Sequence, residues 1–125
     1  MPVLSFHVNL TQGEIVINET IQDIEKRIQA SATLGTRQKS DLLKLLTSLK
    51  TEVDQLSQTH HEDAASITDF IRSTARESLK KQQNPKLVKI SLEGVHASVE
   101  KFEASHPVLT ETVNNLCNYF SGMGI

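Results

Sequence analysis

The sequence has few of the residues that stabilise disulfide-bonded or all-β folds. Its 125 residues include no Trp, one Tyr, four Phe and one Cys. A single cysteine excludes an intramolecular disulfide and a zinc site made only of cysteines. With so few aromatic residues, the core must consist mainly of Leu, Ile and Val, which suits packed helices better than a β-sandwich or barrel. The composition therefore predicts a mainly α protein with one domain spanning residues 1–125.

The sequence also lacks long apolar runs and a strong excess of one charge. No apolar run approaches the roughly 20 residues needed to cross a bilayer. The N-terminus lacks the basic start and continuous apolar stretch of a signal peptide. We therefore expect a cytoplasmic protein with no membrane partner. The formal net charge of −2 predicts no overall attraction to nucleic acid.

Residues 3–17 differ in pattern from the rest of the chain. Apolar and polar residues alternate up to residue 10, a glycine-containing turn follows, and residues 14–17 are rich in β-branched side chains. This pattern predicts a short N-terminal β-hairpin. Because an isolated hairpin is marginal in water, we expect it to lie on the helices or to pair with a second chain. The apolar residues of its two strands are Leu4, Phe6, Val8, Leu10, Ile15 and Ile17.

The remaining residues predict an antiparallel bundle of about five helices. Apolar periodicity, with Gly and Pro near the boundaries, predicts helices over residues 18–34, 36–59, 64–82, 85–104 and 107–121. A polar stretch at residues 60–63 is expected to separate the second helix from the third. Gly94 lies inside the fourth helix, where glycine costs about 0.5–1 kcal/mol relative to Ala, so we expect a neighbouring helix to approach closely there.

The second helix carries apolar residues at alternating spacings of four and three, as in a coiled-coil seam. These residues are Leu42, Leu46, Leu49 and Val53, followed by Leu56. We expect this seam and the hairpin to form the interface of a homodimer or higher homo-oligomer. The alternative is that a bundle buries the seam within one chain.

The one charge asymmetry lies in residues 64–90, which contain six basic residues and only two acidic ones. Arg72, Arg76 and Lys80 recur every four residues and so share one helix face, and Lys81 follows directly. This pattern fits a solvated helix face or a surface for an anion or an acidic protein partner. A nucleic-acid-binding role for the basic stripe at residues 72–89 is the less favoured alternative, because no aromatic residues alternate with the basic ones for base stacking.

No pattern of catalytic or ligand-binding residues is recognisable. The consecutive residues 60–63 (HHED) point in different directions in a turn, so they do not converge on a metal ion. The sequence has no Gly-x-Ser-x-Gly serine elbow and no phosphate-binding glycine loop. We expect His106, which precedes Pro107, to cap a helix. We therefore expect no enzyme, no cofactor and no metal site.

The C-terminal half resembles a known family. The residues that carry this resemblance are 99–107 (VEKFEASHP), the ending 121–125 (SGMGI) and the Leu-rich run 41–56. They are similar to the domain of unknown function 4404 family of small bacterial helical proteins. The resemblance implies a small helical fold and no particular activity or site. A weaker similarity, at residues 84–87 and 106–107, is to helical adaptor modules associated with bacterial effector proteins, which would imply homotypic association.

These patterns favour a non-catalytic, self-associating protein–protein interaction or scaffold module. Two alternatives remain open. One is a nucleic-acid-binding accessory protein that uses the basic stripe, and the other is a helical adaptor of a bacterial defence or effector system.

Overall fold

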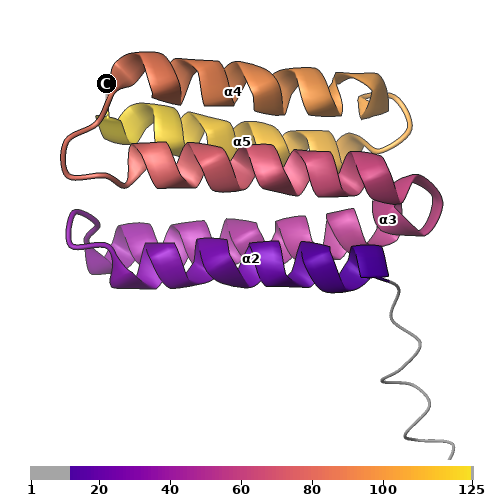
Figure 1. Ribbon diagram of the computed structural model, residues 1–125, viewed down its shortest axis with the longest axis horizontal. Coiled ribbons are helices and arrows are strands. Elements are labelled where there is room, and N and C mark those ends of the chain that lie inside the picture. Colours follow the sequence, from indigo (N-terminus) through magenta and orange to yellow (C-terminus); the bar gives the residue numbers. More distant parts are fainter. Residues whose placement is uncertain (1–11, 125) are drawn as a thin grey trace, which may run out of the picture.

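The computed structural model describes residues 12–124, which form a mainly α bundle, as the sequence predicts (Figure 1). These residues contain four α-helices and no strand. The helices are α2 (Gln12–Ala30), α3 (Thr36–Ser78), α4 (Pro85–Val99) and α5 (Pro107–Gly124). A short 3-10 helix, η1 (Glu100–Phe102), directly follows α4.

The predicted N-terminal β-hairpin is wrong. The predicted return strand, residues 14–17, lies in the first turns of α2, while residues 3–11 lie outside the described residues. Ile17 is fully buried and continues the helical spacing of Ile21 and Ile24 on the face that packs against α3. A short β-branched stretch favours a strand only weakly. The burial of Ile17 on a continuous helical face outweighs that preference.

The prediction of five helices is also wrong, because residues 36–59 and most of 64–82 belong to the single helix α3. Only His60 inside α3 departs from helical geometry, with φ −138° and ψ 58°. The polar residues 60–63 include no Gly or Pro, and the chain returns to helical geometry directly after His60. The sequence therefore predicted the position of the break between the two helical segments, but it predicted a polar connection over residues 60–63 where the structure departs from helical geometry at His60 alone.

Helix α3 doubles back at His60, so its two arms, residues 36–59 and 61–78, run in opposite directions (Figure 1). Helix α2 packs against α3, and α4 and α5 pack against α3 and against each other. Figure 1 shows α4 at the side of the bundle farthest from α2. The Tyr119 hydroxyl of α5 donates a hydrogen bond to Asp41 on the first arm at 3.3 Å, which joins distant parts of the chain.

The core is built from aliphatic side chains of all four helices, together with Phe102 and Phe120. The coiled-coil spacing in the first arm of α3 is buried within one chain, with Leu42, Leu49 and Val53 fully buried. Asn84 caps α4 by accepting a hydrogen bond from the Lys86 amide, and the following Pro85 fits the first helical turn. None of the helices in residues 12–124 is long and apolar enough to span a membrane.

Candidate functional site

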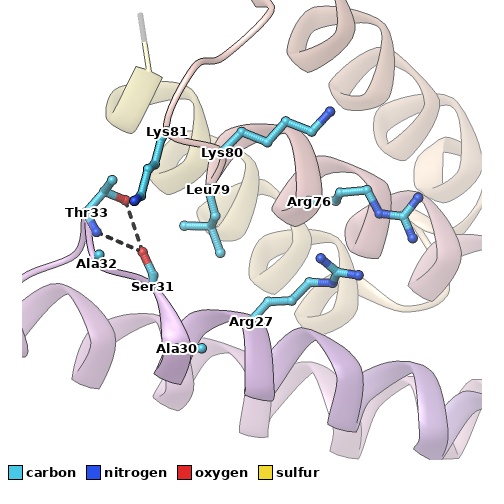
Figure 2. A pocket seen from close by; sticks show the side chains of 9 residues that line it. All are labelled: Arg27, Ala30, Ser31, Ala32, Thr33, Arg76, Leu79, Lys80 and Lys81. Carbon is cyan, nitrogen blue, oxygen red and sulfur yellow. Dashed lines mark hydrogen bonds between the residues drawn. The ribbon is translucent and has the colours of Figure 1, made fainter.

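The most distinctive surface feature is a cationic cleft where the C-terminal end of α2 meets the C-terminal end of α3 (Figure 2). The cleft has a volume of about 690 Å³. Four of its nine lining residues are basic and none is acidic. Its lining residues are Arg27, Ala30, Ser31, Ala32, Thr33, Arg76, Leu79, Lys80 and Lys81.

The reversal of α3 at His60 creates this cleft. Helix α2 and the second arm of α3 run in the same direction, so their last turns lie at the same end of the bundle (Figure 1). Arg27 is in the last turn of α2, and Arg76 is in the last turn of α3. Figure 2 shows both arginine side chains directed toward the same side of the cleft, whereas Lys80 extends away from α2.

The segment after α2 supplies hydroxyl groups to the cleft. The Ser31 and Thr33 hydroxyls are 3.0 Å apart, and the Thr33 backbone N–H donates to Ser31 Oγ at 3.2 Å. Lys39 Nζ, from the first turn of α3, donates to the Gln29 carbonyl at 2.9 Å. This bond satisfies one of the free carbonyl groups at the end of α2 and holds the connecting segment in position.

Two of the four cleft cations form ion pairs with acidic residues three or four positions earlier in the sequence. Arg27 Nε lies 3.0 Å from Asp23 Oδ2, and Lys80 Nζ lies 2.8 Å from Glu77 Oε1. Both pairs are partly exposed, and exposed pairs of this kind contribute typically about 0.2–1 kcal/mol. These side chains can therefore turn to a ligand at low cost.

Arg76 and Lys81 form no ion pair with any residue in the range 12–124. The ends of α2 and α3 each contribute roughly −0.5 of a charge from their helix dipoles, or about −1 together. The two unpaired cations exceed this by about one charge. Stabilisation of the helix ends thus accounts for part of the basic character of the cleft, and a positive potential remains for an anion.

The structure brings together three of the four predicted basic residues. Arg76, Lys80 and Lys81 line the cleft. Arg72 does not line it and instead lies 3.3 Å from Asp69 on the same helix. The sequence reasoning missed Arg27, whose role depends on the pairing of two helix ends. In an antiparallel bundle every second helix runs in the same direction. This topology was the signal that the C-terminal ends of the first and third predicted helices would lie at the same end of the bundle.

The apolar residues predicted for a dimer interface lie in several environments. Ile17, Leu42, Leu46, Leu49 and Val53 are buried between helices of one chain. Ile15 is 40% exposed near the start of α2. The remaining predicted residues, Leu4, Phe6, Val8 and Leu10, lie outside the described residues. The role of these residues in self-association stays a prediction, and for the buried ones it would require the bundle to open.

The histidines near the bend of α3 pack against an aromatic ring. The Phe102 ring contacts both His60 and His106, with ring centroids 5.3 Å and 5.5 Å away and both contacts edge-on. His106 Nδ1 lies 2.9 Å from Ser105 Oγ. Within residues 12–124 there is no group of three or more His, Cys, Asp or Glu side chains placed to hold a metal ion. These contacts indicate a packing role at this end of the bundle.

Two buried or half-buried side chains have raised pKa values. Burial raises the pKa of the Cys117 thiol to about 11, so the nucleophilic thiolate is scarce at neutral pH. Burial, followed by the charge of Asp41 and the hydrogen bond to it, raises the pKa of the Tyr119 hydroxyl, while the charge of Arg37 opposes this shift. Both groups therefore stay protonated at neutral pH.

The geometry defines an all-α bundle protein with an open cationic cleft. Within this class, the chain belongs to the DUF4404 family, because the family model, described as a domain of unknown function, matches residues 42–125. The match covers most of α3 together with α4, η1 and α5, so α2 and its wall of the cleft lie outside it. No curated protein and no solved structure matches the chain.

Proposed function

We propose that this protein is a non-catalytic interaction module that binds an acidic segment of a protein partner in the cationic cleft. The observation that carries this proposal is that four basic residues, from α2, the last turn of α3 and the segment directly after it, line a cleft without acidic lining residues. Carboxylates form charge-assisted hydrogen bonds with arginine and lysine, and arginine binds them through two parallel bonds.

The walls of the cleft support a peptide as the ligand. Ala30, Ala32 and Leu79 provide apolar surface between the basic groups, and the Ser31 and Thr33 hydroxyls provide polar contacts. A volume of about 690 Å³ lies within the roughly 300–1,000 Å³ of ligand pockets. An acidic segment with apolar residues between its carboxylates matches this mixture of surfaces.

Nucleic acid is the less suitable partner for the same cleft. No aromatic side chain lines it, so it lacks the platforms on which proteins stack single-stranded bases. The net excess of about one positive charge is small beside the several phosphate contacts that drive non-specific binding to nucleic acid.

The proposal is tested with the full chain and a fluorescein-labelled peptide of alternating Glu and Leu, by fluorescence anisotropy at low salt. Arg76→Glu is expected to weaken binding at least tenfold, or about 1.4 kcal/mol. Arg72→Glu is the matched control, because it makes the same charge change on the same helix outside the cleft. We expect this control to weaken binding less than Arg76→Glu does, because Arg72 does not line the cleft. Repeating the comparison at about 0.15 M salt, where the Debye length falls to about 8 Å, should bring the control to within about twofold of the wild type.

Three outcomes would contradict the proposal. The first is the absence of peptide binding at low salt. The second is an equal loss of affinity in Arg72→Glu and Arg76→Glu, which would indicate a general charge effect. The third is tighter, Arg76-dependent binding of a single-stranded oligonucleotide of equal charge, which would assign the cleft to nucleic acid.

A further inference from the structure

Helix α4 carries large apolar side chains that are exposed. Leu87 is 42% exposed and Ile90 is 63% exposed. Residues 87, 90, 94 and 97 are spaced by three and four, so they form one stripe along the helix. Phe70 of α3, 41% exposed, extends this stripe because its ring lies against Gly94.

The small residues of the stripe border a hollow. Gly94, Ala97 and Ser98 line a depression of about 340 Å³ between α4 and the second arm of α3, and Phe70 lines it from the opposite helix. At the end of the hollow nearest the bend of α3, Lys101 Nζ lies 2.9 Å from Asp63 Oδ1. The stripe thus consists of two large side chains followed by two small ones beside a hollow.

We propose that a second copy of this chain docks on this face, with the two α4 helices antiparallel. The spacing from Leu87 to Ile90 equals the spacing from Gly94 to Ala97. An antiparallel pairing that sets Leu87 against Ala97 of the second copy therefore also sets Ile90 beside its Gly94, where Ile90 meets the Phe70 ring that lies on this glycine and the hollow next to it. Twofold symmetry makes the same contacts twice.

The charges of this segment favour the same orientation. Lys86 and Lys89 lie in the half that carries the large residues, whereas Glu93 and Glu100 lie in or after the half that carries the small ones. None of these four side chains forms an ion pair with another described residue. Antiparallel pairing brings the basic half of one copy to the acidic half of the other, whereas parallel pairing brings like charges together.

The shape and charge of the face are complementary to themselves, which identifies a second copy as the occupant. This surface differs from the one that the sequence predicted for self-association, since Leu42, Leu46, Leu49 and Val53 are buried within one chain. It lies within the part of the chain that the DUF4404 model matches. It is also separate from the cationic cleft, with which it shares no lining residue.

The mass of the full chain, measured by light scattering across a concentration series, provides the first test. We expect the wild type to form dimers at tens of micromolar and Ile90→Glu to shift the midpoint at least tenfold higher. Val108→Glu is the matched control, because Val108 is 54% exposed on α5 and outside this face. Circular dichroism checks that both variants keep the helical fold. A wild type that stays monomeric, or equal effects of both variants, would overturn the proposal.

A mixed disulfide tests the antiparallel register. Two variants, Leu87→Cys and Ala97→Cys, are prepared in a Cys117→Ser background, oxidised separately and then as an equal mixture. We expect the mixture to yield at least fivefold more disulfide-linked dimer than either variant alone. Faster cross-linking of each variant with itself would indicate a parallel pairing and overturn the register. The last comparison is between the full chain and a variant without residues 1–11. If only the shortened variant dimerises, the N-terminal segment of the chain covers the face, which also overturns the proposal.

Discussion

The aromatic ring of Phe70 on α3 lies directly against the backbone of Gly94 on α4. A Cβ atom at position 94 would be 2.5 Å from Phe70 Cδ1 and 2.6 Å from Phe70 Cε1. Real Cβ atoms do not approach other atoms so closely, so a larger residue at 94 would displace the ring. This contact confirms the close approach that the sequence predicts at Gly94 and explains why glycine is suitable inside a helix that would otherwise favour Ala.

The first prediction follows from this contact and concerns Gly94→Ala. In the wild-type background we expect it to lower the free energy of unfolding by about 1–2 kcal/mol, because overpacking outweighs the helix preference of Ala. In a Phe70→Ala background we expect the same change to raise stability by about 0.5–1 kcal/mol, because only the helix preference remains. Urea denaturation of the four proteins measures both effects. An effect of the same sign in both backgrounds would contradict the proposed contact.

The second prediction distinguishes the helix over residues 12–30 from a β-hairpin. Ile15 and Ile17 would share one face of a strand, whereas in α2 Ile17 is fully buried and Ile15 is 40% exposed. We expect Ile17→Ala to cost about 2–4 kcal/mol of stability. We expect Ile15→Ala to change stability by less than about 0.5 kcal/mol. Denaturant unfolding followed by circular dichroism measures both, and similar losses in the two variants would favour the strand.

The third prediction concerns the only tyrosine of the chain. Because the protein has one Tyr and no Trp, its ultraviolet absorbance change at alkaline pH reports Tyr119 alone. We expect a titration midpoint above the ordinary pKa of 10.0, because burial and Asp41 disfavour the phenolate. Asp41→Asn is expected to lower the midpoint, which stays above 10.0 because the burial remains.

Arg37→Ala serves as the opposite control, since removal of a positive charge near Tyr119 should raise the midpoint further. Circular dichroism at each pH verifies that the protein is still folded during the titration. A midpoint that does not respond to Asp41→Asn would show that the Tyr119–Asp41 hydrogen bond does not persist in solution.

The fourth prediction links Cys117 to the stability of the fold at alkaline pH. The thiol ionises at about 9.0 when exposed in the unfolded chain and at about 11 in the folded one. The folded state therefore holds the proton more tightly than the unfolded state between these values. The contribution of this proton to the free energy of unfolding is fully present below pH 9.0 and is lost as the pH rises toward 11. The total loss is about 2–3 kcal/mol.

We expect Cys117→Ala to remove this part of the pH dependence. The free energy of unfolding of the wild type should fall about 2 kcal/mol more than that of the variant between about pH 8 and pH 10.5. The comparison with the variant cancels the titration of other groups, including Tyr119. Parallel stability curves for the two proteins would show that Cys117 does not contribute.

Local patterns were sufficient for most of the secondary structure. The apolar spacing along α3, α4 and α5 identified the buried side of each helix, and Asn84 with Pro85 marked the start of α4. Two local interpretations were wrong because they weighed a short segment without its tertiary contacts. Residues 14–17 favour a strand by composition, but Ile17 is buried against α3. Residues 60–63 were expected to form a polar connection, whereas the chain reverses at His60 alone and is helical again directly after it.

The basic residues on one wall of the cleft were visible in the sequence, but the residues of the opposite wall were not. Arg76, Lys80 and Lys81 are close together in the sequence, in the last turn of α3 and directly after it, and such a cluster can be read from the sequence alone. Arg27 and the Ser31 and Thr33 hydroxyls join them only because α3 reverses at His60. The direction of a chain reversal depends on long-range packing of side chains that are distant in the sequence.

The sequence by itself determined that this protein is mainly helical, that its core is aliphatic, and that its C-terminal part belongs to the DUF4404 family. These properties depend on side-chain chemistry and local periodicity, which a linear sequence contains. Only the tertiary structure decided that the long seam of α3 is buried within one chain and that Leu87 and Ile90 of α4 stay exposed. The physical reason is that every amphipathic helix requires a covering surface, and only the packing of the whole bundle determines which face receives it.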